Sequence, residues 1–336
     1  MALLVSLFGV SLSTLISSAI LLFIGLIFLG LLMIRLTTTN KVPEIRRFES
    51  EKTYKDPNKN NATYSFPFME EEGSVDLSIV VPAYNEEERM PTMLDEALGY
   101  LKSKKKSNPS FTYEVIIVDD GSKDKTTEIG LQYVKKYGIS NIRVLTLAKN
   151  KGKGGAVRLG VLSSRGRKIL MVDADGATRF SDLTRLDDKL NELVKTKGVK
   201  SAIIVGSRAH LQEEAVAHRS LLRNFLMYAF HFLVWFLCVK GVKDTQCGFK
   251  LFTRPAAFIT FTALHVERWA FDVELLYIAQ QLGIHIDEVA VNWTEIDGSK
   301  MIPFWSWLQM GKDLLLIRLR YVLNAWKIDP VKLKTQ

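Results

Sequence analysis

The chain has 336 residues, which allows one large domain or two modest ones. Its 47% apolar and 24% charged residues are ordinary for a globular protein with additional lipid-facing surface. The two cysteines, Cys238 and Cys247, are too few for a disulfide framework, lie in no metal-binding pattern and fit a reducing compartment. The net charge of +9 suits an anionic partner, such as nucleic acid, a membrane surface or a phosphorylated substrate, although solvated surface charge is the simpler explanation.

The first segment predicts a membrane anchor. Residues 2–34 carry no charge, and a helix needs only ~20 such residues to cross a bilayer. A basic segment before the apolar stretch and a small-residue cleavage site, which a signal peptide has, are not evident, so we expect a retained anchor. Basic residues follow this stretch at Arg35, Lys41, Arg46 and Arg47. The positive-inside bias therefore predicts that the bulk of the chain lies in the cytosol and the N-terminus across the membrane.

Beyond a polar juxtamembrane linker, strand and helix patterns alternate. Strands are predicted at 77–81, 113–118, 142–147, 168–172 and 202–206, and helices at 86–103, 124–137, 154–165 and 181–196. This alternation predicts an α/β fold, with a mostly parallel sheet covered by helices on both faces.

The character of the chain changes after residue 206. Residues 225–239 are apolar except for His231, which predicts a buried or interfacial helix rather than a full membrane span. Residues 304–326 interleave Trp and Tyr with basic residues, a pattern that fits either an amphipathic interfacial helix or ordinary core packing. The predicted divisions are an anchor at 1–36, a linker at 37–75, a catalytic domain at 76–300 and a C-terminal helical segment at 301–336.

Four carboxylates end two of the predicted strands. Asp119 and Asp120 follow the strand at 113–118, whereas Asp173 and Asp175 follow the strand at 168–172. The carboxyl ends of strands in an open α/β sheet line the ligand crevice. A D-x-D pair there suits a divalent cation on a diphosphate, although a helix N-cap is an alternative for Asp120.

Phosphate-binding loops of the common kinds are missing. The turn after the first strand is P-A-Y-N-E, without the glycines of a dinucleotide site, and no Walker A motif is present. Residues 151–155, K-G-K-G-G, either form a plain loop or place backbone N–H groups and Lys153 near phosphates at a helix start.

Taken in order, these motifs resemble the dolichyl-phosphate sugar synthases, which are inverting GT-A glycosyltransferases. The shared segments are V-V-P-A-Y-N-E at 80–86, I-V-D-D-G-S at 117–122, N-K-G-K-G-G-A-V at 150–157 and D-A-D-G-A at 173–177. Further segments resemble the glucosyl branch: G-S-R-A-H at 206–210, D-T-Q-C-G-F-K-L-F at 244–252, W-A-F-D-V-E at 269–274 and D-G-S-K at 297–300.

The resemblance implies a GT-A fold and the transfer of glucose from UDP-glucose to dolichyl phosphate with inversion. The product would be the lipid-linked glucose donor for N-glycosylation at the endoplasmic reticulum membrane. Asp173 and Asp175 would engage the sugar diphosphate and its Mg²⁺ or Mn²⁺. Ala177 stands where mannosyl relatives often have a metal-binding glutamine. The residues expected to bind the nucleotide sugar are Pro82, Tyr84, Glu86, Asp119, Asp120, Lys153, Asp173, Ala174 and Asp175.

Dolichyl phosphate is already an ionised nucleophile at pH 7, because its second pKa is about 6. The expected catalytic groups, besides the two aspartates, are therefore charge-stabilising or orienting residues: Arg208, Asp272 and Glu274. The last two either orient sugar hydroxyls, assist as a base or serve structure alone. The acceptor phosphate is expected to meet Arg208, Arg219, Arg223 and Lys250, with salt bridging as the alternative.

Other function classes stay open at this point. A dolichyl-phosphate mannosyltransferase using GDP-mannose shares the same motifs. A processive polysaccharide synthase would have several membrane spans and a Q-x-x-R-W motif, where this chain has Q-C-G-F-K at 246–250. A tethered binding module would have lost the D-x-D pair. Membrane lipid is an expected partner, and nucleic acid is not.

Overall fold

The computed structural model describes residues 11–38, 47–211, 221–296 and 303–328. These residues form two compact units. Residues 11–38 and 315–328 belong to one unit, and the remaining described residues belong to the other.

Helix α2 (Leu12–Thr37) is long and apolar enough to cross a membrane, judged by length and composition. It is the only helix of the described residues that meets this criterion. Its N-terminus is capped by Ser11, whose hydroxyl accepts from the Thr14 N–H at 3.2 Å. The predicted long apolar helix is therefore present, and its role as a membrane anchor stays a prediction.

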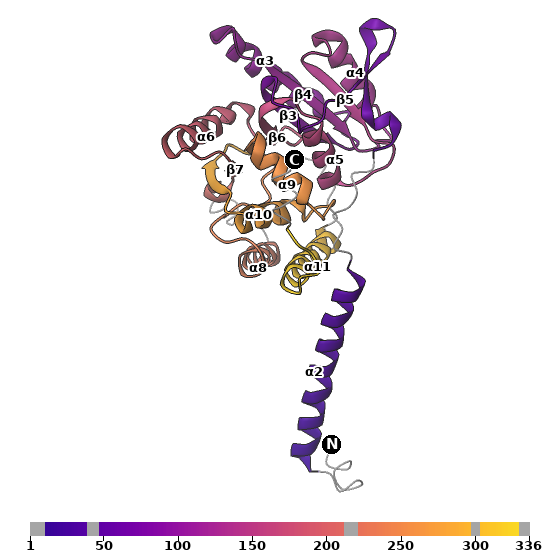
Figure 1. The fold of residues 1–336 in the computed structure, drawn as a ribbon, viewed down its shortest axis with the longest axis vertical. Coiled ribbons are helices and arrows are strands. Elements are labelled where there is room, and N and C mark those ends of the chain that lie inside the picture. Colours follow the sequence, from indigo (N-terminus) through magenta and orange to yellow (C-terminus); the bar gives the residue numbers. More distant parts are fainter. Residues whose placement is uncertain (1–10, 39–46, 212–220, 297–302, 329–336) are drawn as a thin grey trace. The chain divides into compact units, whose positions relative to one another are not determined.

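The larger unit is built on a mixed seven-stranded sheet (Figure 1). Its order is β5-β4-β3-β6-β8-β7-β9, in which β8 alone runs antiparallel to both neighbours. The strands are β3 (Val75–Ala83), β4 (Tyr113–Asp119), β5 (Ile142–Thr146), β6 (Gly166–Met171), β7 (Ala202–Ser207), β8 (Lys250–Thr253) and β9 (His285–Ala290). The sheet is mostly parallel, as predicted.

Helices cover both faces of this sheet because its strands are apolar on both sides. On one face, strand residues such as Ile79, Ile117 and Leu170 pack with α3 (Met90–Ser107), α4 (Thr126–Tyr137) and α6 (Leu183–Lys197). On the other face lie α5 (Lys153–Leu162), α9 (Arg254–Ala263) and α10 (Phe271–Gln281). Gly160 of α5 allows the close approach on that face, since a Cβ there would lie 2.5 Å from Val80.

The five predicted strands and four predicted helices are all present, with ends shifted by a few residues. The predicted linker at 37–75, however, is partly folded. It forms the short helices η1 (Glu49–Lys52) and η2 (Pro57–Lys59) and an antiparallel hairpin of β1 (Thr53–Asp56) and β2 (Ala62–Ser65). The polar composition of this segment gave no local sign of the hairpin. A residue distant in sequence, Arg143, stabilises it by stacking on Tyr54 and Phe66.

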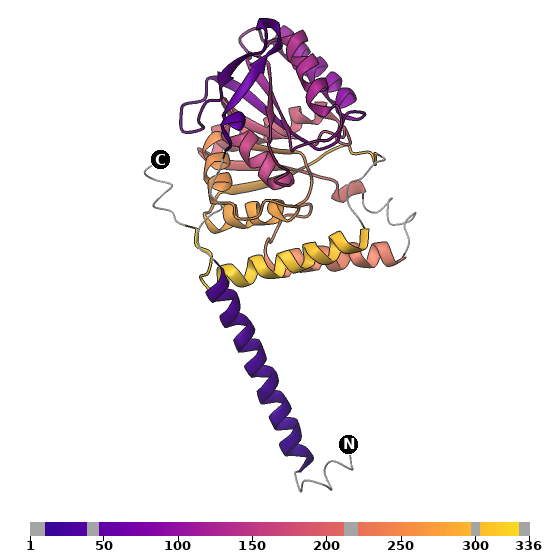
Figure 2. The ribbon, with the colours of Figure 1, turned by 90° about the vertical axis from the view of Figure 1, so that its right-hand side faces the viewer.

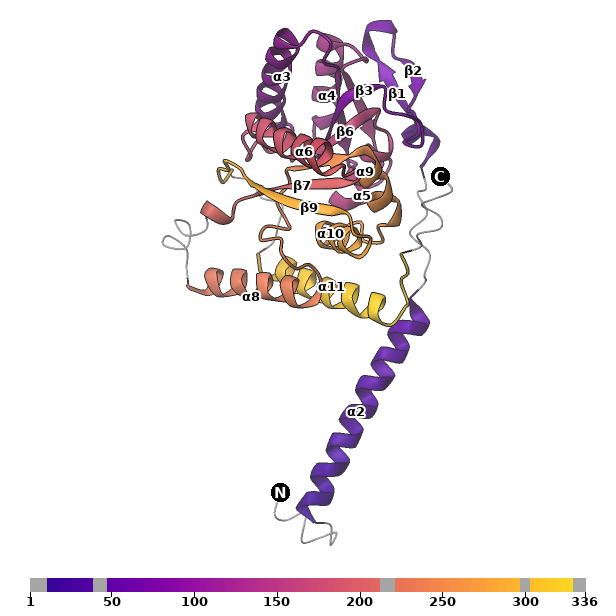
Figure 3. The ribbon, with the colours of Figure 1, turned by 60° about the vertical axis from the view of Figure 1, so that its left-hand side comes forward.

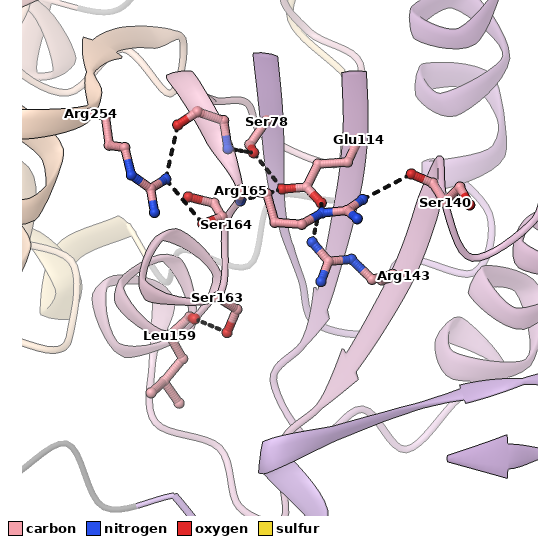
Figure 4. A network of polar contacts seen from close by, with 10 residues as sticks. Ser78, Glu114, Ser140, Arg143, Leu159, Ser163, Ser164, Arg165 and Arg254 are labelled. Carbon is pink, nitrogen blue, oxygen red and sulfur yellow. Dashed lines mark hydrogen bonds and ion pairs between the residues drawn. The ribbon is translucent and has the colours of Figure 1, made fainter. Parts of the chain in front are cut away.

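A buried ionic network closes the amino ends of the central strands (Figure 4). Glu114 accepts hydrogen bonds from Ser78 Oγ at 2.5 Å, from Arg165 Nε at 2.8 Å and from Arg143. Burial alone would raise the pKa of Glu114, but the two arginines lower it below its ordinary value. Figure 4 also shows Arg254 beside Ser164, to whose carbonyl it donates. Arg254 donates to the Gly166 carbonyl as well, at 2.9 Å. This network ties β3, β4, β5 and β6 together at the end of the sheet opposite the acidic pairs.

Two further helices complete the larger elements. Along the chain, α8 (Leu221–Leu237) lies between β7 and β8, and α11 (Pro303–Val322) comes after β9. Helix α8 and the first part of α11 run alongside each other beyond α10 (Figures 2 and 3). Cys238, just after α8, donates to the Leu314 carbonyl at 3.6 Å. One side of α8 leaves four aromatic side chains more than half exposed, Tyr228, Phe232, Trp235 and Phe236. The short helices η3 (Phe180–Asp182) and η4 (Ala209–Leu211) complete the described elements.

Candidate active site

The site lies where β3, β4 and β6 end. Strand β3 pairs in parallel with both β4 and β6, so the three carboxyl ends meet at one edge of the sheet. Asp119 is the last residue of β4, and Asp173 follows β6 by two residues. The predicted convergence of acidic residues from separate strands is thus present.

Asp173 forms an ion pair with Lys153, the first residue of α5. Nζ of Lys153 lies 2.7 Å from Oδ1 and donates to Oδ2 at 2.9 Å. Burial would raise the pKa of Asp173, but Lys153 lowers it below its ordinary value, so the carboxylate is ionised. Among the described residues, no donor has hydrogen-bond geometry to Oδ1. Both oxygens of Asp173 therefore lie against the Lys153 ammonium group, although only Oδ2 accepts a hydrogen bond from it.

Asp175 completes the acidic pair. One of its oxygens accepts from the Ala177 N–H at 3.0 Å, which fixes the turn after β6. Burial, and then repulsion from Asp173, raise the pKa of Asp175. Two carboxylates that repel each other in a half-buried site favour a cation between them. Within the described part of the chain, no cluster of three or more His, Cys, Asp or Glu residues is placed to hold a metal ion.

Gly248 lies against Asp173 and was not predicted as a site residue. A Cβ built at Gly248 would lie 2.0 Å from Oδ2 of Asp173 and 2.3 Å from its Cγ. Any side chain there would displace the carboxylate. The only signal in the sequence was a glycine within the segment 244–252, and it gave no reason to connect that glycine with Asp173.

A second ion pair lies beside the first. Lys250 is fully buried and donates to Asp272 Oδ1 at 2.5 Å and to the Cys247 carbonyl at 2.7 Å. Burial raises the pKa of Asp272 despite this lysine. The carboxylates of Asp173 and Asp272 together outweigh the effect of burial on Lys153 and raise its pKa. Lys250 is thus engaged inside the protein, which disfavours its predicted contact with an acceptor phosphate.

Arg208 follows β7 and is clamped by Asp244. Its Nε and Nη2 donate to the two Asp244 oxygens at 2.7 and 2.8 Å, and its backbone N–H donates at 2.9 Å. Its guanidinium lies over the Trp293 ring, 5.4 Å from the centroid. Burial opposes the charge of Arg208, but Asp244 raises its pKa further above the ordinary value. Asp244 and Trp293 were not predicted as site residues. They lie 36 and 85 positions beyond Arg208, and no local pattern connects them with it.

Trp293 itself is held close to the acidic pair. It forms an isolated antiparallel bridge with Thr178, and the neighbouring Thr294 N–H donates to the Ala177 carbonyl at 2.8 Å. The carboxylate of Asp182 accepts from the backbone N–H of Asn292 at 2.6 Å and from its side chain. The segment after β9 is therefore attached to the turn that carries Asp175.

Glu274, one of the predicted catalytic residues, is fully buried. Its carboxylate accepts from the N–H groups of His265 and Val266 and lies 2.9 Å from Nδ1 of His265. These contacts fix the chain between α9 and α10. They correspond to the structural alternative for Glu274, since a carboxylate with no exposed atom has no path to a sugar hydroxyl.

The predicted nucleotide-binding residues differ in their exposure. Pro82 and Tyr84 are half-buried at the end of β3, whereas Glu86 is buried and paired with Arg89. Asp119 accepts from the Ser122 N–H at 2.8 Å and from the Thr127 hydroxyl. Ala174 is buried between the two aspartates of the acidic pair.

Asp120 is occupied by the glycine-rich loop. Its carboxylate accepts from the backbone N–H groups of Lys151 at 2.7 Å and Gly152 at 2.9 Å. Burial raises the pKa of Asp120 to about 6, although these two donors oppose the shift. Asp120 therefore supports the loop that leads into Lys153.

Two residues predicted to bind the acceptor phosphate cannot be placed at the site. Arg219 is not among the described residues, and the side chain of Arg223 in α8 is not described.

Comparison with known proteins identifies the family. Residues 78–257 match the model of glycosyl transferase family 2. The chain is 58% identical to a human protein named dolichyl-phosphate beta-glucosyltransferase, over 89% of this chain and 92% of that protein. It is 54% identical to the Drosophila melanogaster protein of the same name, over 88% and 90% of the two chains.

Solved structures agree on the fold. The crystal structure of glucosyl-3-phosphoglycerate synthase from Mycobacterium tuberculosis, in complex with phosphoglyceric acid, superposes with a TM-score of 0.51 at 17% identity. The match covers 73% of this chain and 80% of that one, and it confirms the predicted GT-A fold. With the acidic pair at the carboxyl edge of this sheet, the chain is a glycosyltransferase and belongs to the dolichyl-phosphate β-glucosyltransferases of glycosyl transferase family 2.

Proposed function

We propose that this enzyme transfers glucose from UDP-glucose to dolichyl phosphate with inversion, forming dolichyl β-glucosyl phosphate. The observation that carries the proposal is the Asp173–Asp175 pair beside Lys153 at the carboxyl edge of the sheet. The names of the human and Drosophila relatives support the acceptor and the sugar.

The residues present fit a divalent cation on the donor diphosphate. Asp173 Oδ1 accepts no hydrogen bond and has only the Lys153 ion pair among the described residues, and repulsion between the two carboxylates contributes to the raised pKa of Asp175. Asp173 and Asp175 would hold Mg²⁺ or Mn²⁺, which would neutralise charge on the leaving diphosphate. Lys153, at the start of α5, would also stabilise the negative charge on the diphosphate. Its pKa is raised, so its side chain stays protonated.

On the acceptor side, we propose that Arg208 orients the phosphate. Its position is set by Asp244 and Trp293, and Asp173 is near enough to contribute to its raised pKa. A guanidinium held on one side by a carboxylate is preorganised to meet phosphate oxygens on the other. The acceptor phosphate needs no general base, because it is ionised at neutral pH. We assign Asp272 and Lys250 to positioning this charge cluster and Glu274 to structure.

We further propose that α2 anchors the enzyme in the endoplasmic reticulum membrane with the catalytic domain in the cytosol. The basic residues that follow α2 along the chain support this orientation. The sequons at Asn61 and Asn292 should then carry no glycan in the native host. A mobility shift on glycosidase treatment would contradict the orientation.

The decisive assay combines membranes carrying the full chain with dolichyl phosphate, Mg²⁺ or Mn²⁺ and a panel of radiolabelled nucleotide sugars. We expect a single glucolipid product from UDP-glucose, whose C1–phosphate linkage should be β when the intact product is measured by NMR. Preference for GDP-mannose would favour the mannosyl alternative. A polymeric product would favour the processive synthase, and no transfer from any donor would overturn the proposal.

A further inference from the structure

The segment Arg47–Lys52 lies outside the region matched by the glycosyltransferase family model, yet it packs against the active-site loop. It begins ten residues after the end of α2 and leads through η1 into the β1–β2 hairpin. The loop that it meets, residues 147–152, runs directly into Lys153.

Glu51 is the centre of this contact. It is fully buried, and its Oε1 accepts from the Ala148 N–H at 2.9 Å. Its Oε2 accepts from Nζ of Lys151 at 3.1 Å and from the Phe48 N–H at 3.1 Å. A carboxylate can be buried only when such donors replace its water, so these contacts fix the loop and the segment together.

Two neighbours of Glu51 reinforce the contact. Arg47 Nη2 donates to the Leu159 carbonyl in α5 at 3.3 Å. The ring of Phe48 lies beneath the ammonium groups of Lys149 and Lys151, each 5.9 Å from its centroid. The segment therefore touches both the loop and the helix that the loop begins.

Asp120 holds the loop from the other side, through the backbone N–H groups of Lys151 and Gly152. Gly152 has a φ of +83°, a conformation that L side chains rarely adopt. The next residue is Lys153, which reaches Asp173. Two buried carboxylates thus grip the backbone immediately before the lysine that pairs with the acidic site.

We infer that Glu51 is a positioning residue for glycosyl transfer, which sets the loop so that Lys153 is held on Asp173. The inference rests on the proposed function, because it assigns Lys153 and Asp173 to the donor diphosphate. A misplaced charge in a preorganised site lowers the rate of the chemical step, so the loss should appear in kcat.

The test uses the full-length protein in detergent or membranes. Glu51→Gln keeps the size of the side chain and an acceptor for Ala148, but removes the charge opposite Lys151. Glu49→Gln is the matched control, because Glu49 lies in the same turn, is exposed and pairs only locally with Lys52. Lys151→Met removes the same ion pair from the other partner.

We expect Glu51→Gln to lower kcat about 10-fold, with little change in the KM for UDP-glucose, and Glu49→Gln to behave as wild type. Lys151→Met should cause a similar loss, and the double variant should lose less than the product of the two effects. Additive effects, or a Glu51→Gln enzyme with wild-type kcat, would overturn the inference.

Hydrogen exchange supplies a readout that does not depend on turnover. Glu51→Ala should accelerate exchange of the amides at 148–152, where Glu49→Gln should not. Unchanged exchange in the Ala variant would overturn the inference even if the enzyme proved to use another donor. Conversely, faster exchange together with no glucosyl transfer by the wild-type protein would reject the proposed function and leave the loop contact standing.

Discussion

Single residues at this site act through charge and through the space around it. Asp173 and Asp175 differ in environment although they are two positions apart. Asp173 is paired with Lys153, whereas Asp175 is held by a backbone N–H and repelled by its neighbour. The pair is therefore short of positive charge on the side of Asp175.

Asp175→Asn removes one anionic donor at nearly constant volume. We expect glucosyl transfer to fall by about 10²-fold or more, the usual effect of losing one strong electrostatic contact in the transition state. Steady-state rates with and without EDTA are the measurement. Asp188→Asn, an exposed aspartate on α6, is the control. Full activity in EDTA or in the Asp175 variant would contradict a metal-dependent reaction.

Gly248→Ala tests the space beside Asp173. The added methyl group would meet the Asp173 carboxylate at 2.0 Å, so the carboxylate must turn away from Lys153. We expect kcat to fall about 10²-fold while the fold persists. Gly99→Ala in α3 is the control, because among the described residues no atom beyond its own stretch of helix lies within 4 Å of its Cβ position. Equal activity of the two variants would show that the Asp173 carboxylate does not require that space.

At the scale of elements, the two ends of the sheet have different tasks. The carboxyl ends of β3, β4 and β6 carry the site, whereas the amino ends carry the Glu114 network. Helix α5 starts at the site and passes beneath β3 and β4. The amino-end network therefore holds the strands whose other ends must stay aligned.

Glu114→Gln should destabilise the fold by about 3 kcal/mol, because it leaves the buried Arg143 without a counter-charge. The pKa of Glu114 is lowered in the folded state, so its stabilisation is present at neutral pH and lost as the pH falls through the folded pKa. Urea unfolding of the full chain at several pH values measures both effects. Glu192→Gln, in an exposed pair with Lys189, should stay within about 0.5 kcal/mol of wild type.

For the molecule as a whole, we expect the catalytic unit to work at a membrane surface, because the proposed acceptor is a lipid. The exposed aromatics of α8 would offer the membrane a second apolar contact besides α2. An amphipathic helix of this kind lies in the headgroup region, where nearby basic residues strengthen binding to anionic lipids. Contact of the helices at 225–239 and 304–326 with lipid therefore remains a prediction.

Liposome flotation of a chain lacking residues 1–36 tests that contact. We expect retained, salt-sensitive association, since each basic residue near an anionic surface contributes about 1 kcal/mol. Phe232→Ser with Trp235→Ser should abolish it, whereas Phe68→Ser, an exposed aromatic between β2 and β3, should not. A folded, monomeric truncated protein that ignores liposomes would leave the N-terminal helix as the sole membrane contact.

Local patterns in the sequence were enough to predict the apolar N-terminal helix, the alternating strands and helices, and the convergence of acidic residues at one sheet edge. These follow from local patterns: an uncharged run, apolar runs of strand length, and polar residues just after them. Because parallel neighbours share an edge, local order along the chain was enough to bring Asp119 and Asp173 to the same side of the sheet.

The partners of the charged residues, in contrast, depend on the packing of distant segments. Glu51 meets a lysine 100 positions away, Arg208 is gripped by Asp244, and Gly248 lies against Asp173. Lys250 and Glu274, which the sequence offered as contacts for substrate, are instead buried against Asp272 and His265. A local pattern predicts that a residue is polar, but its partner depends on which distant segments pack together, and burial makes that partner obligatory.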